Sequence, residues 1–205
     1  MKKYLFFPLL LAFSWGEVSV KDLKNGDLIF VGAENSAFSE AISNATKKDS
    51  ANFTHTAIVE VSKDGIFVIE ASSDKNGVVR TAWQDFQKEN KKRHIELMRL
   101  KDSSNVDMNA IITRAKSFLG QAYDFYFYPN NSKMYCTELV WEAYLDNKGK
   151  RIIFEAKPMN FYAADGSLPV YFKELFEKLG VAVPQGVLGT NPNDMSKSKA
   201  LYRVK

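Results

Sequence analysis

The sequence predicts an α+β domain in which a few antiparallel strands pack against helices. Two segments rich in β-branched residues, 54–61 and 66–71, are joined by the short turn sequence Ser62–Gly65, which is typical of a β-hairpin. Three later segments, described below, carry apolar residues at helical spacing. The chain contains no internal repeat and no low-complexity linker, so we expect a single domain.

The first half of the chain predicts mostly strands. Segment 23–31 is a turn followed by a short apolar strand, whereas segment 36–46 has the apolar spacing of a helix. After the hairpin, segment 78–86 crosses to another short strand or helix. Segment 94–100 alternates apolar and polar residues like a strand.

The second half predicts three helices. Asp107 is placed to cap a helix that runs to Leu119, and Gly120 suits its end. The second helix covers 136–145, and the third covers 170–179.

Glycines follow the last two of these helices, because Gly149 comes after the second and Gly180 after the third. Beyond Pro184 the chain is loop-like. It closes with a possible strand over 200–204.

Composition excludes several classes of protein. The 205 residues are 45% hydrophobic and 25% charged, which excludes a disordered chain, a collagen-like repeat and a disulfide-rich miniprotein. One cysteine allows neither an internal disulfide nor a multi-cysteine zinc or iron–sulfur site. Two histidines argue against a histidine-rich metal site, so we expect no metal and no organic cofactor.

Residues 1–16 have the layout of a secretory signal peptide. Lys2 and Lys3 precede the apolar run Tyr4–Phe13, and small residues stand at the −3 and −1 positions of a cleavage site before Glu17. The apolar run is far shorter than the roughly 20 residues of a membrane span. An uncleaved anchor is the alternative. We expect an exported protein, periplasmic or secreted, with a mature domain over 17–205 and no transmembrane segment.

Charge does not indicate a nucleic-acid partner. The net charge of +4 falls to +2 once Lys2 and Lys3 are removed. The one dense basic cluster lies in a polar turn and is expected to be a solvated loop; it comprises Lys88, Lys91, Lys92 and Arg93.

Cys136 opens a predicted helix, and this position favours a reactive thiol. A helix N-terminus presents free N–H groups and the positive end of the helix dipole. Both stabilise a thiolate, and the same N–H groups can stabilise a tetrahedral oxyanion beside the sulfur. The alternative is a small buried apolar cysteine.

His55 is the better of the two candidate bases, because His94 lies in the basic sequence KKRH and is expected to be solvated. If Lys63 and Asp64 form the centre of the hairpin turn, His55 and Glu70 become diagonal neighbours on one face. Glu70 would then orient the imidazole. The alternatives are a core histidine and an edge-exposed glutamate.

Short motifs in a fixed order resemble the permuted branch of NlpC-type papain-like cysteine amidases and peptidases, the YiiX/YaeF-like proteins. The motifs are NGDLIF (25–30), THTAIV (54–59), VIEA (68–71), LGQAYDFYF (119–127), YCTELV (135–140), PMNF (158–161) and VPQG (183–186). Together they cover about 23 to 200. The resemblance implies a permuted papain-like fold, with an antiparallel sheet or small barrel packed against helices.

The resemblance also implies roles for individual residues. Cys136 matches the nucleophile, His55 the general base and Glu70 the orienting acid, while Tyr123 matches a tyrosine whose hydroxyl lies near the oxyanion site. The chain departs from the family pattern at three places. Thr137 stands where the family often has serine, and Ala122 where it often has proline. Phe125-Tyr126 replaces the glycine pair of the usual motif. The last change indicates a different pocket wall.

The residues and the resemblance together predict a cysteine hydrolase of amide bonds. Its substrate would be a cell-wall peptide, an N-acyl amino acid or a lipid amide. Aromatic residues over 123–128 and 154–172 suit an apolar acyl chain, although core packing explains them equally well. Two alternatives remain: an envelope lipid- or peptide-binding module with a vestigial triad, and an acyltransferase that uses the same thioester.

Overall fold

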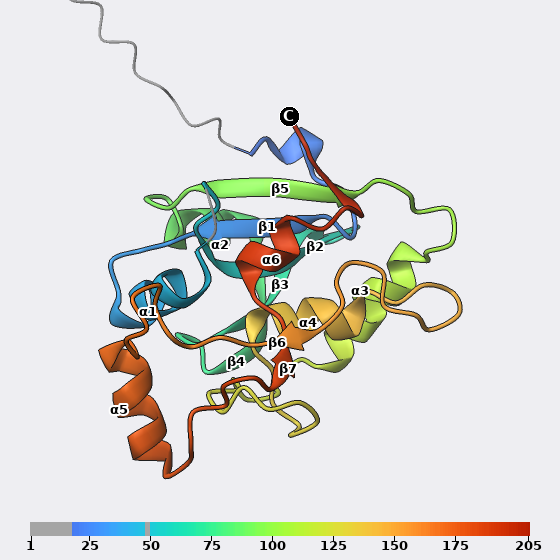
Figure 1. The fold of residues 1–205 in the computed structure, drawn as a ribbon. Coiled ribbons are helices and arrows are strands. Elements are labelled where there is room, and N and C mark those ends of the chain that lie inside the picture. Colours follow the sequence, from blue (N-terminus) through green and yellow to red (C-terminus); the bar gives the residue numbers. More distant parts are fainter. Residues whose placement is uncertain (1–17, 48–49) are drawn as a thin grey trace, which may run out of the picture.

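The computed structural model describes residues 18–47 and 50–205 (Figure 1). The predicted signal peptide over 1–16 lies outside the described residues, so export stays a prediction. Within the described ranges, no helix is both long and apolar enough to cross a bilayer.

A six-stranded antiparallel sheet forms the centre of the fold, in the order β4-β3-β2-β1-β5-β8. The strands are β1 (Leu28–Gly32), β2 (Phe53–Ser62), β3 (Gly65–Ser72), β4 (Gly77–Ala82), β5 (Ile95–Leu100) and β8 (Leu201–Arg203). Ser62 pairs with Gly65, so Lys63 and Asp64 are the central residues of the β2–β3 turn. The predicted hairpin and its register are confirmed.

Helices and short elements cover both faces of the sheet. Helices α3 (Met108–Ser117) and α4 (Cys136–Ala143) lie side by side against one face, where Leu28, Ile58 and Ile69 are fully buried (Figure 1). The other face buries Val59 and Val68, among others, against Trp83 and Phe86 of α2 (Trp83–Glu89). A short 3-10 helix, η1 (Val20–Asp22), precedes the first strand. The predicted α+β fold with an antiparallel sheet against helices is confirmed.

The predicted helices form, with differences at their ends. Ser36 caps α1 (Ala37–Thr46) and Asp107 caps α3, both through side-chain oxygens. Gly180, with a φ of 68°, ends α5 (Val170–Leu179) in the left-handed conformation. Helix α3 stops before Leu119, which is exposed rather than part of an apolar face.

Segment 78–86 was expected to be either a strand or a helix, and it contains both: β4 runs directly into α2. The tail is more ordered than the predicted loop. It contains β7 (Leu188–Gly189), which pairs with the earlier strand β6 (Lys157–Pro158), and helix α6 (Pro192–Ser196). Buried Asn193 in α6 binds the backbone N–H and carbonyl of Phe53, which attaches the tail to the start of β2.

A β-bulge precedes His55 on β2. Val31 pairs with His55, but Gly32 pairs with Phe53, so Thr54 is left without a partner on β1. A bulge bends a strand and redirects the neighbouring side chains. The Thr54 hydroxyl is held by Ser39 at 3.0 Å and by Arg93 at 3.0 Å. The bulge therefore stands directly beside the candidate base.

Gly77 allows the loop that carries Tyr123 to approach β4. A Cβ atom at position 77 would lie 2.3 Å from the backbone oxygen of Gln121. We expect Gly77→Ala to lower the free energy of unfolding by about 2 kcal/mol, because the backbone at Gln121 would have to move. Chemical denaturation measures this. Gly120→Ala is the control, because a Cβ at this position meets no atom within 4 Å. Only its positive φ of 86° should lower the free energy of unfolding, by about 1 kcal/mol. Equal losses in the two variants would contradict the steric argument.

Candidate active site

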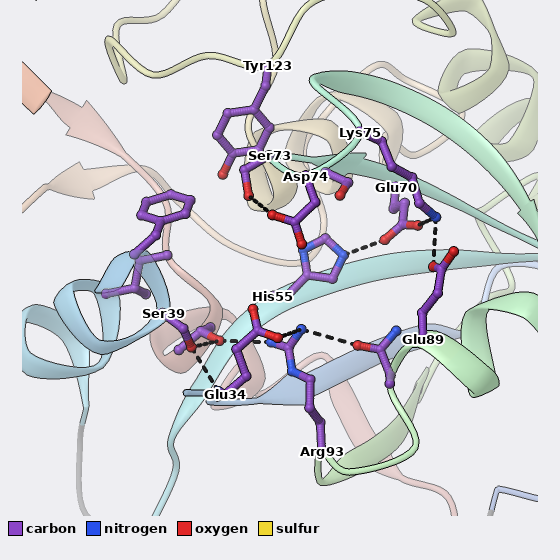
Figure 2. Close-up of a pocket in the computed structure, with 15 residues that line it drawn as sticks. Glu34, Ser39, His55, Glu70, Ser73, Asp74, Lys75, Glu89, Arg93 and Tyr123 are labelled. Atoms are coloured by element: carbon purple, nitrogen blue, oxygen red, sulfur yellow. Dashed lines mark hydrogen bonds and ion pairs between the residues drawn. The ribbon is translucent and has the colours of Figure 1, made fainter. Parts of the chain in front are cut away.

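His55 and Glu70 face each other across the β2–β3 hairpin. The imidazole Nε2 lies 2.7 Å from Oε2 of Glu70, and Glu70 is 4% exposed (Figure 2). The buried position rules out the edge-exposed glutamate. Since Nε2 is engaged by the carboxylate, the proton-accepting or donating position left on the ring is Nδ1.

Two further side chains hold the Glu70 carboxylate. Its Oε1 accepts from Lys75 Nζ at 3.0 Å and from the Thr81 hydroxyl at 3.2 Å. Lys75 is itself anchored by Thr81 at 2.9 Å and Glu89 at 2.8 Å, and Figure 2 shows Glu70 between His55 and Lys75. A carboxylate with all these partners is fixed in one orientation.

Cys136 is the first residue of α4, and its thiol lies close enough to His55 to affect the pKa of the imidazole. Burial acts to lower the pKa of His55. The interaction with Cys136 and the hydrogen bond and charge of Glu70 outweigh burial and raise this pKa from 6.5 to about 9. His55 is therefore protonated at neutral pH in this arrangement. Cys136 is 5% exposed, but it lines a pocket instead of being sealed in the core.

Glu70 remains ionised throughout the physiological pH range. Burial opposes its ionisation, but the bond and charge of His55 and then the charge of Lys75 lower its pKa to about 2. The structure thus brings together a thiol, an imidazole and a carboxylate in the order that nucleophilic thiol chemistry requires.

Two adjoining cavities meet at these residues. His55 and Glu70 line a polar cleft of about 310 Å³, whose other polar groups include Glu34, Asp74, Lys75, Glu89, Asn90 and Arg93. Cys136 lines a smaller, apolar pocket of about 60 Å³. Its walls include Ile42, Ala45, Phe127, Met159, Phe161 and Phe172. Ile42, Thr54 and Tyr123 line both cavities, so the cleft and the pocket adjoin.

Tyr123 is buried at this junction and is 5% exposed. Burial, together with the nearby charge of Cys136, raises the pKa of Tyr123 well above its usual range. Its hydroxyl therefore keeps its proton and can donate a hydrogen bond to a substrate oxygen. The predicted oxyanion role of Tyr123 stays a prediction.

The structure corrects the expectation for Arg93. Lys88, Lys91 and Lys92 are exposed as expected, but Arg93 turns inward and lines the polar cleft. Its guanidinium donates to the carbonyl of Gly32 at 2.8 Å and to Thr54 at 3.0 Å. Arg93 therefore supports the bulge beside His55, because a guanidinium can bind several oxygens at once.

His94 also differs from its expected solvated position. Its ring stacks on Phe53 at 6.1 Å between centroids, and its Nε2 lies 2.8 Å from Glu96. His94 does not line either of the two cavities at the site. His55 is thus the histidine that reaches the thiol.

Comparison with known proteins identifies the family of this chain. Residues 22–205 match the model of the permuted papain-like amidase enzymes, the YaeF/YiiX or C92 family. This chain belongs to the permuted papain-like amidase family. Membership supports a papain-like cysteine hydrolase in general terms, because the family is one of amidases and peptidases. The family resemblance predicted from the motifs is confirmed.

A relative and a solved structure support the same assignment. The chain is 29% identical over 189 residues to "Uncharacterized protein YiiX" of Escherichia coli (strain K12), covering 90% of this chain and 86% of that protein. A crystal structure of YiiX from Escherichia coli O157:H7 superposes with a TM-score of 0.70 at 25% identity, covering 89% of this chain and 96% of that one. The permuted papain-like fold is therefore confirmed.

The YiiX of that crystal structure is described as a metalloprotein. Over residues 18–47 and 50–205 of the present chain, no three or more histidine, cysteine, aspartate or glutamate side chains are grouped so as to hold a metal ion.

Proposed function

We propose that this permuted papain-like amidase cleaves an amide bond through a Cys136–His55–Glu70 triad and an acyl-enzyme. The observation that carries the proposal is the His55–Glu70 pair, joined at 2.7 Å and held beside the Cys136 thiol at the start of α4. Candidate substrates are a cell-wall peptide, an N-acyl amino acid and a lipid amide. Export, predicted from residues 1–16, is part of the proposal.

The first step forms the thioester. Cys136 sulfur, paired with the His55 imidazolium, attacks the carbonyl carbon and forms a C–S bond. The oxyanion lies near the backbone N–H of Cys136 at the start of α4, and in this proposal the hydroxyl of Tyr123, which lines the same pocket, donates a second hydrogen bond. His55 then gives its proton to the nitrogen as the C–N bond breaks, and the amine leaves.

The second step releases the acyl group. His55, now neutral, takes a proton from water, and the resulting oxygen nucleophile attacks the thioester carbon. The C–S bond breaks and the thiolate recovers its imidazolium partner. Glu70 stabilises this cation and fixes the ring orientation in both steps. An acceptor other than water at the second step would make the enzyme an acyltransferase.

Alkylation of Cys136 across pH tests the proposed pair. With iodoacetamide and intact-mass detection, we expect the purified protein to react at pH 6 roughly 10- to 100-fold faster than His55→Ala, because the imidazole beside the sulfur activates it for attack. The Cys136→Ser variant should take up no label. Hydrolysis itself should persist up to about pH 9 and then decline, since the pKa of His55 is raised to about 9.

His94→Ala is the matched control, since it removes the other histidine and leaves the triad intact. We expect it to react like the unchanged protein. Equal labelling rates for His55→Ala and His94→Ala would overturn the triad and favour a binding module.

A further inference from the structure

We infer that the substrate is an acyl amide of a hydrophilic amine, with its acyl group in the apolar pocket and its amine in the polar cleft. This inference rests on the proposed function and adds the orientation and class of the substrate. The orientation follows from the cavities that the two catalytic residues line: Cys136 lines the apolar pocket and His55 lines the polar cleft.

The chemistry determines the two ends of the substrate. The sulfur of Cys136 bonds to the carbonyl carbon, so the acyl chain continues from the sulfur into space that Cys136 lines. Cys136 lines the apolar pocket and not the polar cleft. His55 must reach the amide nitrogen to protonate it, so the amine continues into space that His55 lines. His55 lines the polar cleft and not the apolar pocket.

The apolar pocket is formed by buried aromatic rings. Phe127 packs with ring centroids 5.5 Å from both Tyr135 and Phe161, and 6.4 Å from Phe172. These three phenylalanines are buried and line the pocket, so the aromatic segments serve as core and as pocket wall. An apolar wall of this kind favours a hydrocarbon chain over a charged group.

The position of Phe127 carries backbone strain. Its φ is 55°, a left-handed conformation that bulky side chains rarely adopt. Asp124, which is fully buried, holds this conformation by accepting N–H bonds from Tyr126 at 2.9 Å and Tyr128 at 3.1 Å. Strain maintained by a buried carboxylate indicates that the place of Phe127 in the wall matters for function.

The polar cleft suits the amine. Glu34, Asp74 and Glu89 are exposed and line this cleft together with His55 (Figure 2). Lys75 and Arg93 engage other side chains of the same wall. An amine with hydroxyl, amide or charged groups can hydrogen-bond to these carboxylates, whereas an alkylamine would displace water from them and offer no hydrogen bond in return.

Acylation by esters tests the acyl pocket. Acetyl and butyryl esters of para-nitrophenol should both acylate Cys136, seen by intact mass and by release of para-nitrophenolate. We expect the butyryl ester to react about 15-fold faster, the factor for two buried methylene groups. Ala45→Leu, which fills part of the pocket, should lower the ratio of the butyryl rate to the acetyl rate from about 15 to about 1.

Ala37→Leu is the control for Ala45→Leu, because it places the same side chain on the exposed start of α1. It should leave both ester rates unchanged. Acylation at equal rates by both esters, or equal effects of the two variants, would overturn the acyl pocket while leaving the triad intact. If neither ester acylates Cys136 faster than it acylates the His55→Ala variant, the proposed function itself fails.

Aminolysis of the butyryl-enzyme tests the polar cleft. We expect ethanolamine to capture the acyl group about 10-fold better than propylamine, after correction for their uncatalysed reaction with a small butyryl thioester. A preference for propylamine would overturn the assigned orientation.

Discussion

Glu70→Gln should reduce kcat/KM by about 10³-fold, because an uncharged amide cannot stabilise the imidazolium that forms beside the thiolate. The Glu70 carboxylate contacts His55 Nε2 at 2.7 Å, and its charge is one of the causes that raise the pKa of His55 to about 9. In the variant we therefore expect a lower pKa for His55 and an alkaline limit of activity that moves toward neutral pH. Hydrolysis of an N-butyryl anilide across pH measures both effects.

Glu60→Gln is a close control. Glu60 lies on β2, is 4% exposed, and accepts from Arg80 at 2.6 Å and Lys116 at 3.0 Å. Like Glu70 it is a buried carboxylate of the sheet held by cations, but it lines neither cavity. We expect Glu60→Gln to lower the melting temperature without changing kcat/KM or its pH profile. If the Glu70→Gln variant has the same pH profile as the unsubstituted protein, Glu70 has only a structural role.

Glu138→Gln should stabilise the protein at alkaline pH by on the order of 3 kcal/mol. Glu138 lies in the first turn of α4 and is 7% exposed. Burial, then repulsion by Asp124, raises its pKa from 4.5 to about 8. The folded state therefore retains a proton that the unfolded chain has lost, and stability falls as pH rises from 4.5 to about 8. Glutamine resembles the protonated acid at every pH.

Chemical denaturation at pH 5 and pH 9 measures this difference. The gain of Glu138→Gln over the unchanged protein should be near zero at pH 5 and complete at pH 9. Contributions common to both proteins, including that of His55, cancel in the comparison. Glu142→Gln, on the same helix but partly exposed and paired with Arg151, should show no such gain. A gain for Glu138→Gln that is equal at both pH values would contradict the raised pKa.

The sequence predicts the hairpin and its polar pair because both depend on local spacing. A two-residue turn at Lys63-Asp64 determines which residues of β2 and β3 face each other, so His55 and Glu70 follow from counting. Helix starts at Ser36 and Asp107 are predictable for a similar reason, since a cap acts within its own first turn.

What the sequence leaves unpredicted depends on distant contacts. Arg93 belongs to a basic cluster in the sequence, and only the fold brings it to Thr54, 39 residues away. Helix α6 has five residues and is too short to show an apolar period; Asn193 ties it to Phe53, 140 residues away. Lys75 follows Glu70 closely, but a lysine in a polar turn has no pattern that distinguishes it from a solvated one.

The hairpin that joins His55 to Glu70 also bears on when the site becomes reactive during folding. The two residues are 15 apart, whereas His55 and Cys136 are 81 apart. Closing the longer loop costs about 1.5 kcal/mol more in chain entropy, so the base and its acid can associate before the nucleophile joins them. The only thiol of the chain then gains its imidazolium partner last, when α4 docks on the sheet. A newly made or unfolded chain would carry an ordinary cysteine, and thiol reactivity would report completed folding.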